Sequence, residues 1–116
     1  MRNKNVRYGL PTKNGLVSSL SSPGVAMLEN RIERRLVERA KEAGGMAIKW
    51  VAPAMAGVPD RIVFLPAGVV IFVELKAPGK QSSPLQVRIQ QMLRDLGADV
   101  RVIDSLEGVD AMFAKK

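Results

Sequence analysis

Residues 57–76 read GVPDRIVFLPAGVVIFVELK, a segment with the pattern of a β-hairpin. Two segments within it, 60–65 and 69–76, are rich in the β-branched and aromatic residues that strands prefer. The proline, alanine and glycine at 66–68 lie between these segments and favour a tight turn. We therefore expect an antiparallel hairpin with a three-residue loop.

The register of this hairpin brings two acidic side chains together. A three-residue loop pairs Leu65 with Val69. The same register pairs Asp60 with Glu74, and their Cβ atoms are then about 5 Å apart. Two ionised carboxylates at that separation repel by about 3 kcal/mol at an effective dielectric of about 20. A divalent cation between them, with Lys76 nearby, turns this repulsion into a binding site. A two-residue loop would put Asp60 on the opposite face, so the inference depends on the turn.

The strand at 69–76 alternates between a wholly apolar face and a mixed face. The apolar face, which belongs in the core, carries Val69, Ile71, Val73 and Leu75. On the mixed face, Glu74 and Lys76 follow two apolar residues. The charged pair is therefore expected at the edge of the packed region.

The rest of the chain predicts three helices and two more strands around the hairpin. The expected helices are 27–43, 84–96 and 106–113, and the further strands are 46–51 and 100–103. Ser82 or Ser83 caps the second helix, Pro84 is its first residue and Gly97 ends it. The apolar face of that helix carries Leu85, Ile89, Met92, Leu93 and Leu96. The order αβββαβα predicts one α/β domain at 25–116, a mixed central sheet flanked by helices, behind a flexible extension at 1–24.

The composition narrows the possible chemistry. The 116 residues include no cysteine and no histidine, which excludes disulfides, thiolate zinc sites and histidine-based catalysis. Catalysis would then depend on carboxylates, lysine and a hard cation with oxygen ligands. The formal charge of +7 suits a nucleic-acid partner, although a solvated basic face would give the same count. With no apolar run long enough for a membrane span and no secretion signal, we expect a cytoplasmic protein.

The first predicted helix carries two acids within its apolar arc. That arc is defined by Leu28, Ile32, Leu36, Ala40 and Ala43. Glu29 and Glu33 fall inside it, and a buried carboxylate needs a partner, a hydrogen bond or a metal. Either the two acids lie at the margin and pair with arginines, or one of them faces the predicted cation site.

Two motifs, Gly57-Val58-Pro59-Asp60 and Phe72-Val73-Glu74-Leu75-Lys76, resemble those of the VRR-NUC family, a branch of the PD-(D/E)XK nuclease superfamily. The resemblance covers roughly residues 28–109 and includes the Ser-Pro-Leu-Gln start of the second helix. It implies the PD-(D/E)XK nuclease fold and metal-dependent hydrolysis of DNA phosphodiester bonds. It also implies a phage-type enzyme that works in a bacterial host as a homodimer on branched DNA, such as four-way junctions.

The resemblance also implies roles for individual residues. Asp60, Glu74 and the backbone carbonyl of Leu75 would bind Mg²⁺ or Mn²⁺, and Glu33 would bind it through water, with Glu29 as the alternative helix acid. Lys76 would orient or activate the attacking water, and Gln86 matches the glutamine of the family's second helix. The catalytic residues expected on this basis are Asp60, Glu74, Lys76, Glu33 and Gln86.

Three basic residues are candidates for contacts with nucleic acid, namely Lys49, Arg61 and Lys80. Lys49 is equally compatible with a solvent-facing position in its strand, and Lys80 with an ordinary surface loop. We expect no small-molecule substrate and no membrane partner. A less selective flap or end nuclease, a nickase, and a non-catalytic DNA-binding module on the same scaffold are the competing hypotheses.

Overall fold

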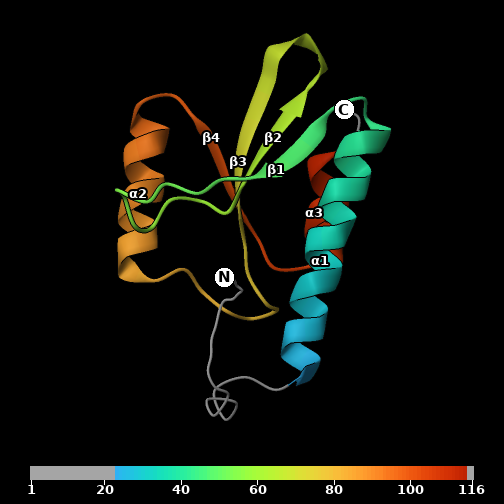
Figure 1. Ribbon diagram of the computed structural model, residues 1–116, viewed down its shortest axis with the longest axis horizontal. Coiled ribbons are helices and arrows are strands. Elements are labelled where there is room, and N and C mark those ends of the chain that lie inside the picture. The colour runs from blue at the N-terminus through green and yellow to red at the C-terminus, as the bar shows by residue number, and fades with distance from the viewer. Residues whose placement is uncertain (1–22, 115–116) are drawn as a thin grey trace.

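The computed structural model describes residues 23–114, which form a four-stranded sheet and three α-helices (Figure 1). The elements are α1 (Pro23–Glu42), β1 (Met46–Lys49), β2 (Arg61–Leu65), the short 3-10 turn η2 (Pro66–Gly68), β3 (Val69–Leu75), α2 (Pro84–Asp95), β4 (Asp99–Ile103) and α3 (Leu106–Met112). The predicted order αβββαβα is confirmed. Helix α1 begins at Pro23, so residues 23 and 24 belong to the helix and not to the expected extension. The remainder of that extension, 1–22, lies outside the described residues.

The sheet has the strand order β1-β2-β3-β4, with two antiparallel pairings followed by a parallel one. The hairpin prediction is confirmed, because Leu65 pairs with Val69 across a three-residue turn. In that turn Ala67 and Gly68 adopt positive φ angles of 68° and 77°. The mixed sheet expected from the sequence is therefore present, and β4 pairs in parallel with β3 after the crossover through α2.

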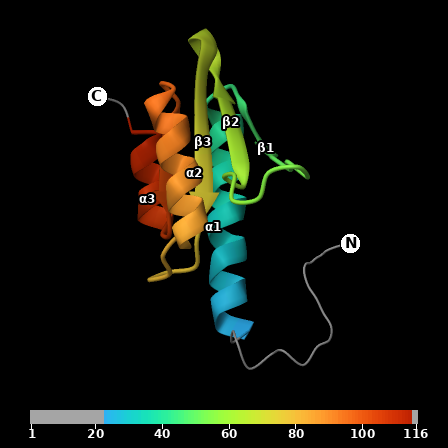
Figure 2. The same ribbon diagram turned by 90° about the vertical axis from the view of Figure 1, so that its left-hand side faces the viewer.

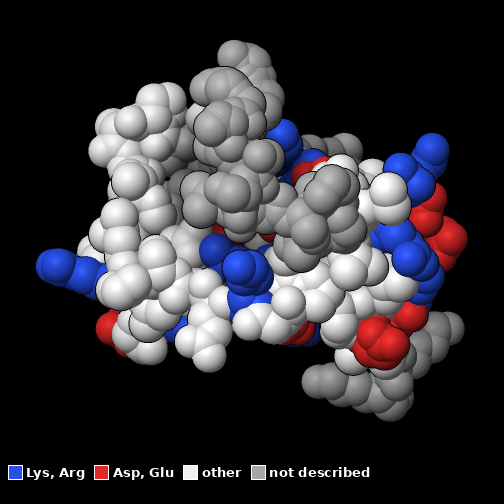
Figure 3. All heavy atoms as spheres, turned by 90° about the horizontal axis from the view of Figure 1, so that it is seen from below, with Lys and Arg blue, Asp and Glu red and all other residues white. Residues whose placement is uncertain are grey.

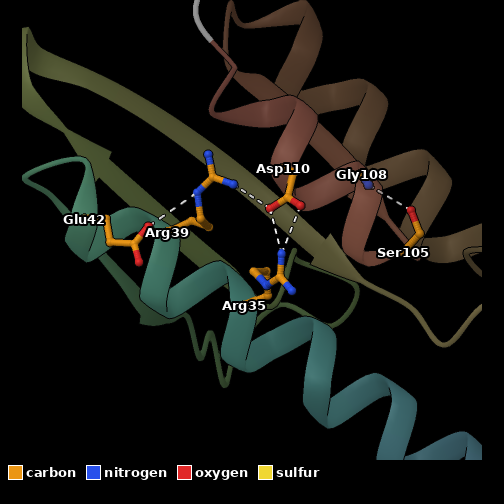
Figure 4. A network of polar contacts seen from close by, with 6 residues as sticks. All are labelled: Arg35, Arg39, Glu42, Ser105, Gly108 and Asp110. Atoms are coloured by element: carbon orange, nitrogen blue, oxygen red, sulfur yellow. Dashed lines mark hydrogen bonds and ion pairs between the residues drawn. The ribbon is translucent and has the colours of Figure 1, made fainter.

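The core lies between one face of the sheet and the helices α1 and α3. Val63, Ile71, Val73 and Leu75 supply the strand side of this core, and Ile32, Leu36, Ala40 and Val109 supply the helix side. Arg35 and Arg39 of α1 both pair with Asp110 of α3, at 2.9 and 2.6 Å, and so hold the two helices together (Figure 4). Val69 was expected in the core but is 43% exposed, because it lies at the hairpin tip, which projects beyond the helices (Figure 1).

Helix α2 covers only part of the opposite face of the sheet. It packs on β4, and Figure 2 shows that it leaves β1 and β2 uncovered. Of its predicted apolar face, Ile89 is buried, but Leu85, Met92 and Leu96 are 47%, 46% and 85% exposed. Much of this stripe is exposed because the sheet lies under only one edge of it. No helix within residues 23–114 is long and apolar enough to cross a membrane.

Candidate active site

The two predicted strand acids lie at adjoining ends of β2 and β3. Asp60 immediately precedes β2, and Glu74 is the penultimate residue of β3. The ladder pairs Arg61 with Val73, and the same register, continued by one residue, sets Asp60 opposite Glu74. Oδ2 of Asp60 accepts a hydrogen bond of 3.1 Å from the backbone N–H of Leu75. This bond fixes the Asp60 carboxylate against the end of β3.

Glu74 is far more buried than the sequence suggested, with 2% of its surface exposed. Its Oε2 lies 3.2 Å from Nζ of Lys76 and accepts a 3.0 Å hydrogen bond from Nε2 of Gln86. Its Oε1 is also buried but has no hydrogen-bond partner among residues 23–114. Burial and, next, the charge of Asp60 raise the pKa of Glu74 to about 7, although Lys76 opposes the shift. The site therefore holds a carboxylate that needs a further positive partner.

Gln86 connects the start of α2 to this carboxylate and its lysine. Its Oε1 accepts hydrogen bonds from Nζ of Lys76 and from the backbone N–H of Ser83, both of 2.8 Å. The Ser83 hydroxyl accepts in return from the backbone N–H of Gln86, which completes a capping box. The residue that caps α2 thus also holds Lys76 and Glu74, and Ser83, not Ser82, is the cap.

Helix α1 brings two acids toward the strand ends, but they have different surroundings. Glu33 forms an ion pair with Arg61, and their side chains are 37% and 12% exposed. Glu29, one turn earlier, has no ion pair within residues 23–114, and burial and then the charge of Asp60 raise its pKa. Burial likewise raises the pKa of Asp60, while the Leu75 N–H and Lys76 oppose the rise. Although Asp60 is an exposed residue overall, its carboxylate shares one electrostatic environment with Glu29 and Lys76.

The expected binding of a metal by Asp60, Glu74 and, through water, Glu33 stays a prediction. Within residues 23–114 no three acidic residues are grouped closely enough to hold a metal ion. Glu33 instead forms an ion pair with Arg61, whose nearly buried guanidinium group needs a counter-charge. The donor set that fits a hard cation is smaller: the orphaned Oε1 of Glu74 and the neighbouring carboxylate of Asp60, at the Leu75 end of β3.

The three residues predicted to contact nucleic acid differ in how far their side chains are exposed. Lys49 is exposed at the end of β1, and Lys80 is exposed in the loop before α2. Arg61 is directed toward Glu33 with only 12% of its side chain exposed, so this structure does not present it to DNA. Side chains at the end of β2 alternate faces, and Arg61 falls on the side of α1, so its predicted contact with DNA stays a prediction.

One buried polar residue was missed by sequence reasoning. Gln90 is 3% exposed, and its Nε2 donates a 3.0 Å hydrogen bond to Oγ of Ser82. This bond ties the loop that carries Lys80 to α2. The available signal was the position of Gln90 next to Ile89 and one turn after Gln86, on the flank that faces the sheet.

A mixed sheet flanked by helices, with acids at the ends of two neighbouring strands and a lysine two residues beyond the second, defines the PD-(D/E)XK class of nuclease folds. No family model matches the chain. A curated protein of Acyrthosiphon pisum secondary endosymbiont phage 1, named "Putative nuclease p44", is 49% identical over 77 residues, covering 66% of this chain and 83% of that protein. A solved structure described as a VRR_NUC domain superimposes with a TM-score of 0.69 at 35% identity, covering 72% of this chain and 91% of the other. The chain belongs to the VRR-NUC family.

Proposed function

We propose that this chain is a metal-dependent endonuclease that hydrolyses phosphodiester bonds in DNA. The observation that carries the proposal is the carboxylate of Glu74, which is almost completely buried beside Asp60 and has one oxygen without a hydrogen-bond partner among residues 23–114. An apolar packing position would not retain such a group, because an unpaired buried carboxylate costs free energy. In a cation-binding site, by contrast, this carboxylate would serve as a ligand.

The residues present fit a divalent cation with oxygen ligands. Oε1 of Glu74 and the carboxylate of Asp60 would hold it, with the backbone carbonyl of Leu75 as a further ligand. Such hard oxygen donors suit Mg²⁺ or Mn²⁺. When bound, the cation supplies a Lewis acid that offsets charge on the scissile phosphate.

Lys76 supplies the positive charge that the protein itself brings to the reaction. Its side chain is 18% exposed, and its ammonium group is held between Glu74 and Gln86. A lysine fixed in this way can orient a water molecule and offset negative charge that develops on the phosphate. Gln86 acts as a positioning residue, because its amide contacts both Lys76 and Glu74.

Metal dependence on a panel of DNA substrates tests this proposal. Cleavage of labelled four-way, flap and linear DNA is expected with Mg²⁺ or Mn²⁺ and is expected to stop in EDTA. We propose that the four-way junction is the preferred substrate. Cleavage that persists in EDTA would refute the metal mechanism, and binding of every substrate without cleavage would identify a non-catalytic module.

We also propose that the enzyme is a homodimer that acts in the cytoplasm of a bacterial host. The phage origin of one relative supports the host assignment. The uncovered sheet face supports the dimer, since it presents Met46, Ile48, Phe64 and Val70 at 38–56% exposure. Leu85 packs beside Gly57 of the β1–β2 loop, so the exposed flank of α2 borders the same face. Contiguous apolar surface of this kind marks an association site, and a second copy would supply the second active site that symmetric cleavage of a junction needs.

Phe64→Glu is expected to convert the dimer to a monomer. The phenylalanine is 39% exposed near the middle of the uncovered face, and a carboxylate buried there between two copies would have no partner. Light scattering at micromolar concentration measures the change. Val87→Glu is the matched control, because Val87 is 51% exposed on the opposite flank of α2. A wild-type monomer, or a Phe64→Glu dimer, would contradict the assignment of this face.

A further inference from the structure

A second charged surface lies on α1 and the start of α3, outside the candidate active site. A hollow of about 220 Å³ is lined by Arg31, Arg34, Arg35, Glu38 and Leu106, and we call it the arginine hollow. It brings three guanidinium groups to one place with one carboxylate among the lining side chains. Figure 3 shows basic side chains, interspersed with acidic ones, gathered on the side of the molecule where α1 and α3 lie, whereas the side of α2 is mostly uncharged.

The arginines of the hollow differ in how they are held. Arg31 and Arg34 are exposed and form no ion pair with any residue in the range 23–114. Nη1 of Arg35 contacts both carboxylate oxygens of Asp110, at 3.1 and 2.9 Å, and this fixes its guanidinium group (Figure 4). The hollow therefore has one preset cation and two free ones, a combination suited to phosphate oxygens.

The arginine hollow and the strand ends of the candidate active site lie on different sides of α1. Glu33 faces Arg61 and the strand ends, whereas Arg34 and Arg31 lie about 100° and 160° away around α1. A helix with its side chains is about 10 Å thick, so the two sides of α1 face different directions. A duplex with a persistence length of about 150 base pairs resists bending, so following α1 from one side to the other would cost one duplex several kcal/mol.

We infer that the arginine hollow binds the phosphate backbone of a second DNA segment, the arm of a branched substrate that is not being cleaved. The inference rests on the proposed function and adds to it a binding surface for the branched substrate, because a linear duplex has no second arm to place there. The contact is electrostatic and independent of sequence, so it contributes affinity and orientation. Branch selectivity then comes from having two separated phosphate-binding surfaces on one domain.

Binding of a four-way junction and of a linear duplex with the sequence of one arm tests this inference, with the full chain in EDTA. The double variant Arg31→Glu/Arg34→Glu is expected to weaken junction binding about tenfold or more and to reduce the slope of log affinity against log salt by about 2. Linear-duplex affinity is expected to change by less than about threefold. Both substituted residues are exposed, and circular dichroism would confirm that the variant is folded.

Arg88→Glu is the matched control, since Arg88 is exposed on α2 and contributes nothing to the hollow. Equal losses on junction and linear DNA, an unchanged junction affinity, or the same selective loss in Arg88→Glu would each overturn the second-arm assignment. Cleavage of the four-way junction by the wild type with Mg²⁺ reports separately on the proposed function, so the two can fail independently.

Discussion

Glu74→Gln is expected to reduce cleavage by about 10³-fold or more and, in the same protein, to stabilise the metal-free fold above pH 7. Activity is lost because the amide removes the anionic oxygen available to a cation. The cation stabilises the charge of the transition state by several kcal/mol, and each 1.4 kcal/mol lost lowers the rate about tenfold. Removing the charge also removes the free-energy cost of burying an ionised carboxylate, since Glu74 is 2% exposed and its Oε1 has no hydrogen-bond partner within residues 23–114.

The pH dependence of that stabilisation has a definite sign. Burial raises the pKa of Glu74 from 4.5 to about 7 in the folded protein, so between these pH values the folded state binds more protons than the unfolded state. Its contribution to stability is therefore fully present below about pH 4.5 and is lost as pH rises through 7. The shift corresponds to at most about 3 kcal/mol. Glutamine resembles the protonated acid, so the variant should match the wild type near pH 5 and exceed it by about 1–3 kcal/mol at pH 8.5.

Urea denaturation in EDTA at pH 5 and pH 8.5 measures the stability difference, and turnover of the preferred substrate with Mg²⁺ measures the rate. Glu42→Gln serves as the control for the amide substitution, because Glu42 is 71% exposed and its contact with Arg39 is long, at 3.7 Å. A Glu74→Gln variant that keeps its activity, or that is less stable at pH 8.5 than the wild type, would show that the buried carboxylate has a structural role instead.

The sequence was sufficient for the local geometry of the site. Turn chemistry at 66–68 determined the loop length, and strand alternation then placed Glu74 and Lys76 on one face, so that neither step needed a distant contact. The exposed flank of α2 could not be foreseen in this way. Helical periodicity identifies an apolar stripe, but not whether a sheet, a second copy or solvent lies opposite it.

The helix acids are the clearest case of a limit set by long-range contacts. Family resemblance implied Glu33, and periodicity placed both Glu29 and Glu33 in the apolar arc. The deciding contact, between Glu33 and Arg61, joins residues 28 positions apart. The burial of Gln90 depended in the same way on Ser82, which only the folded loop brings near it.

Glu29→Gln and Glu33→Gln are expected to separate catalysis from stability. Glu29→Gln should lower the rate by about 10–100-fold, as the loss of an outer metal partner does, with little change in stability. Its carboxylate lies in the field of Asp60 and Lys76 and has no ion pair with any other residue in 23–114. Glu33→Gln should instead cost about 1–3 kcal/mol of stability, because it leaves the nearly buried Arg61 without its counter-charge.

Two measurements on each variant separate these effects: the rate as a function of Mg²⁺ concentration, and the unfolding free energy in EDTA. For Glu29→Gln the Mg²⁺ requirement should rise, whereas Glu33→Gln should keep the wild-type requirement at a temperature where it is fully folded. Arg61→Met combined with Glu33→Gln should recover part of the lost stability, since both ends of the ion pair are then neutral. If Glu33→Gln is as stable as the wild type but shifts the Mg²⁺ requirement, Glu33 must leave Arg61 when the metal binds, and the assignment of Glu29 fails.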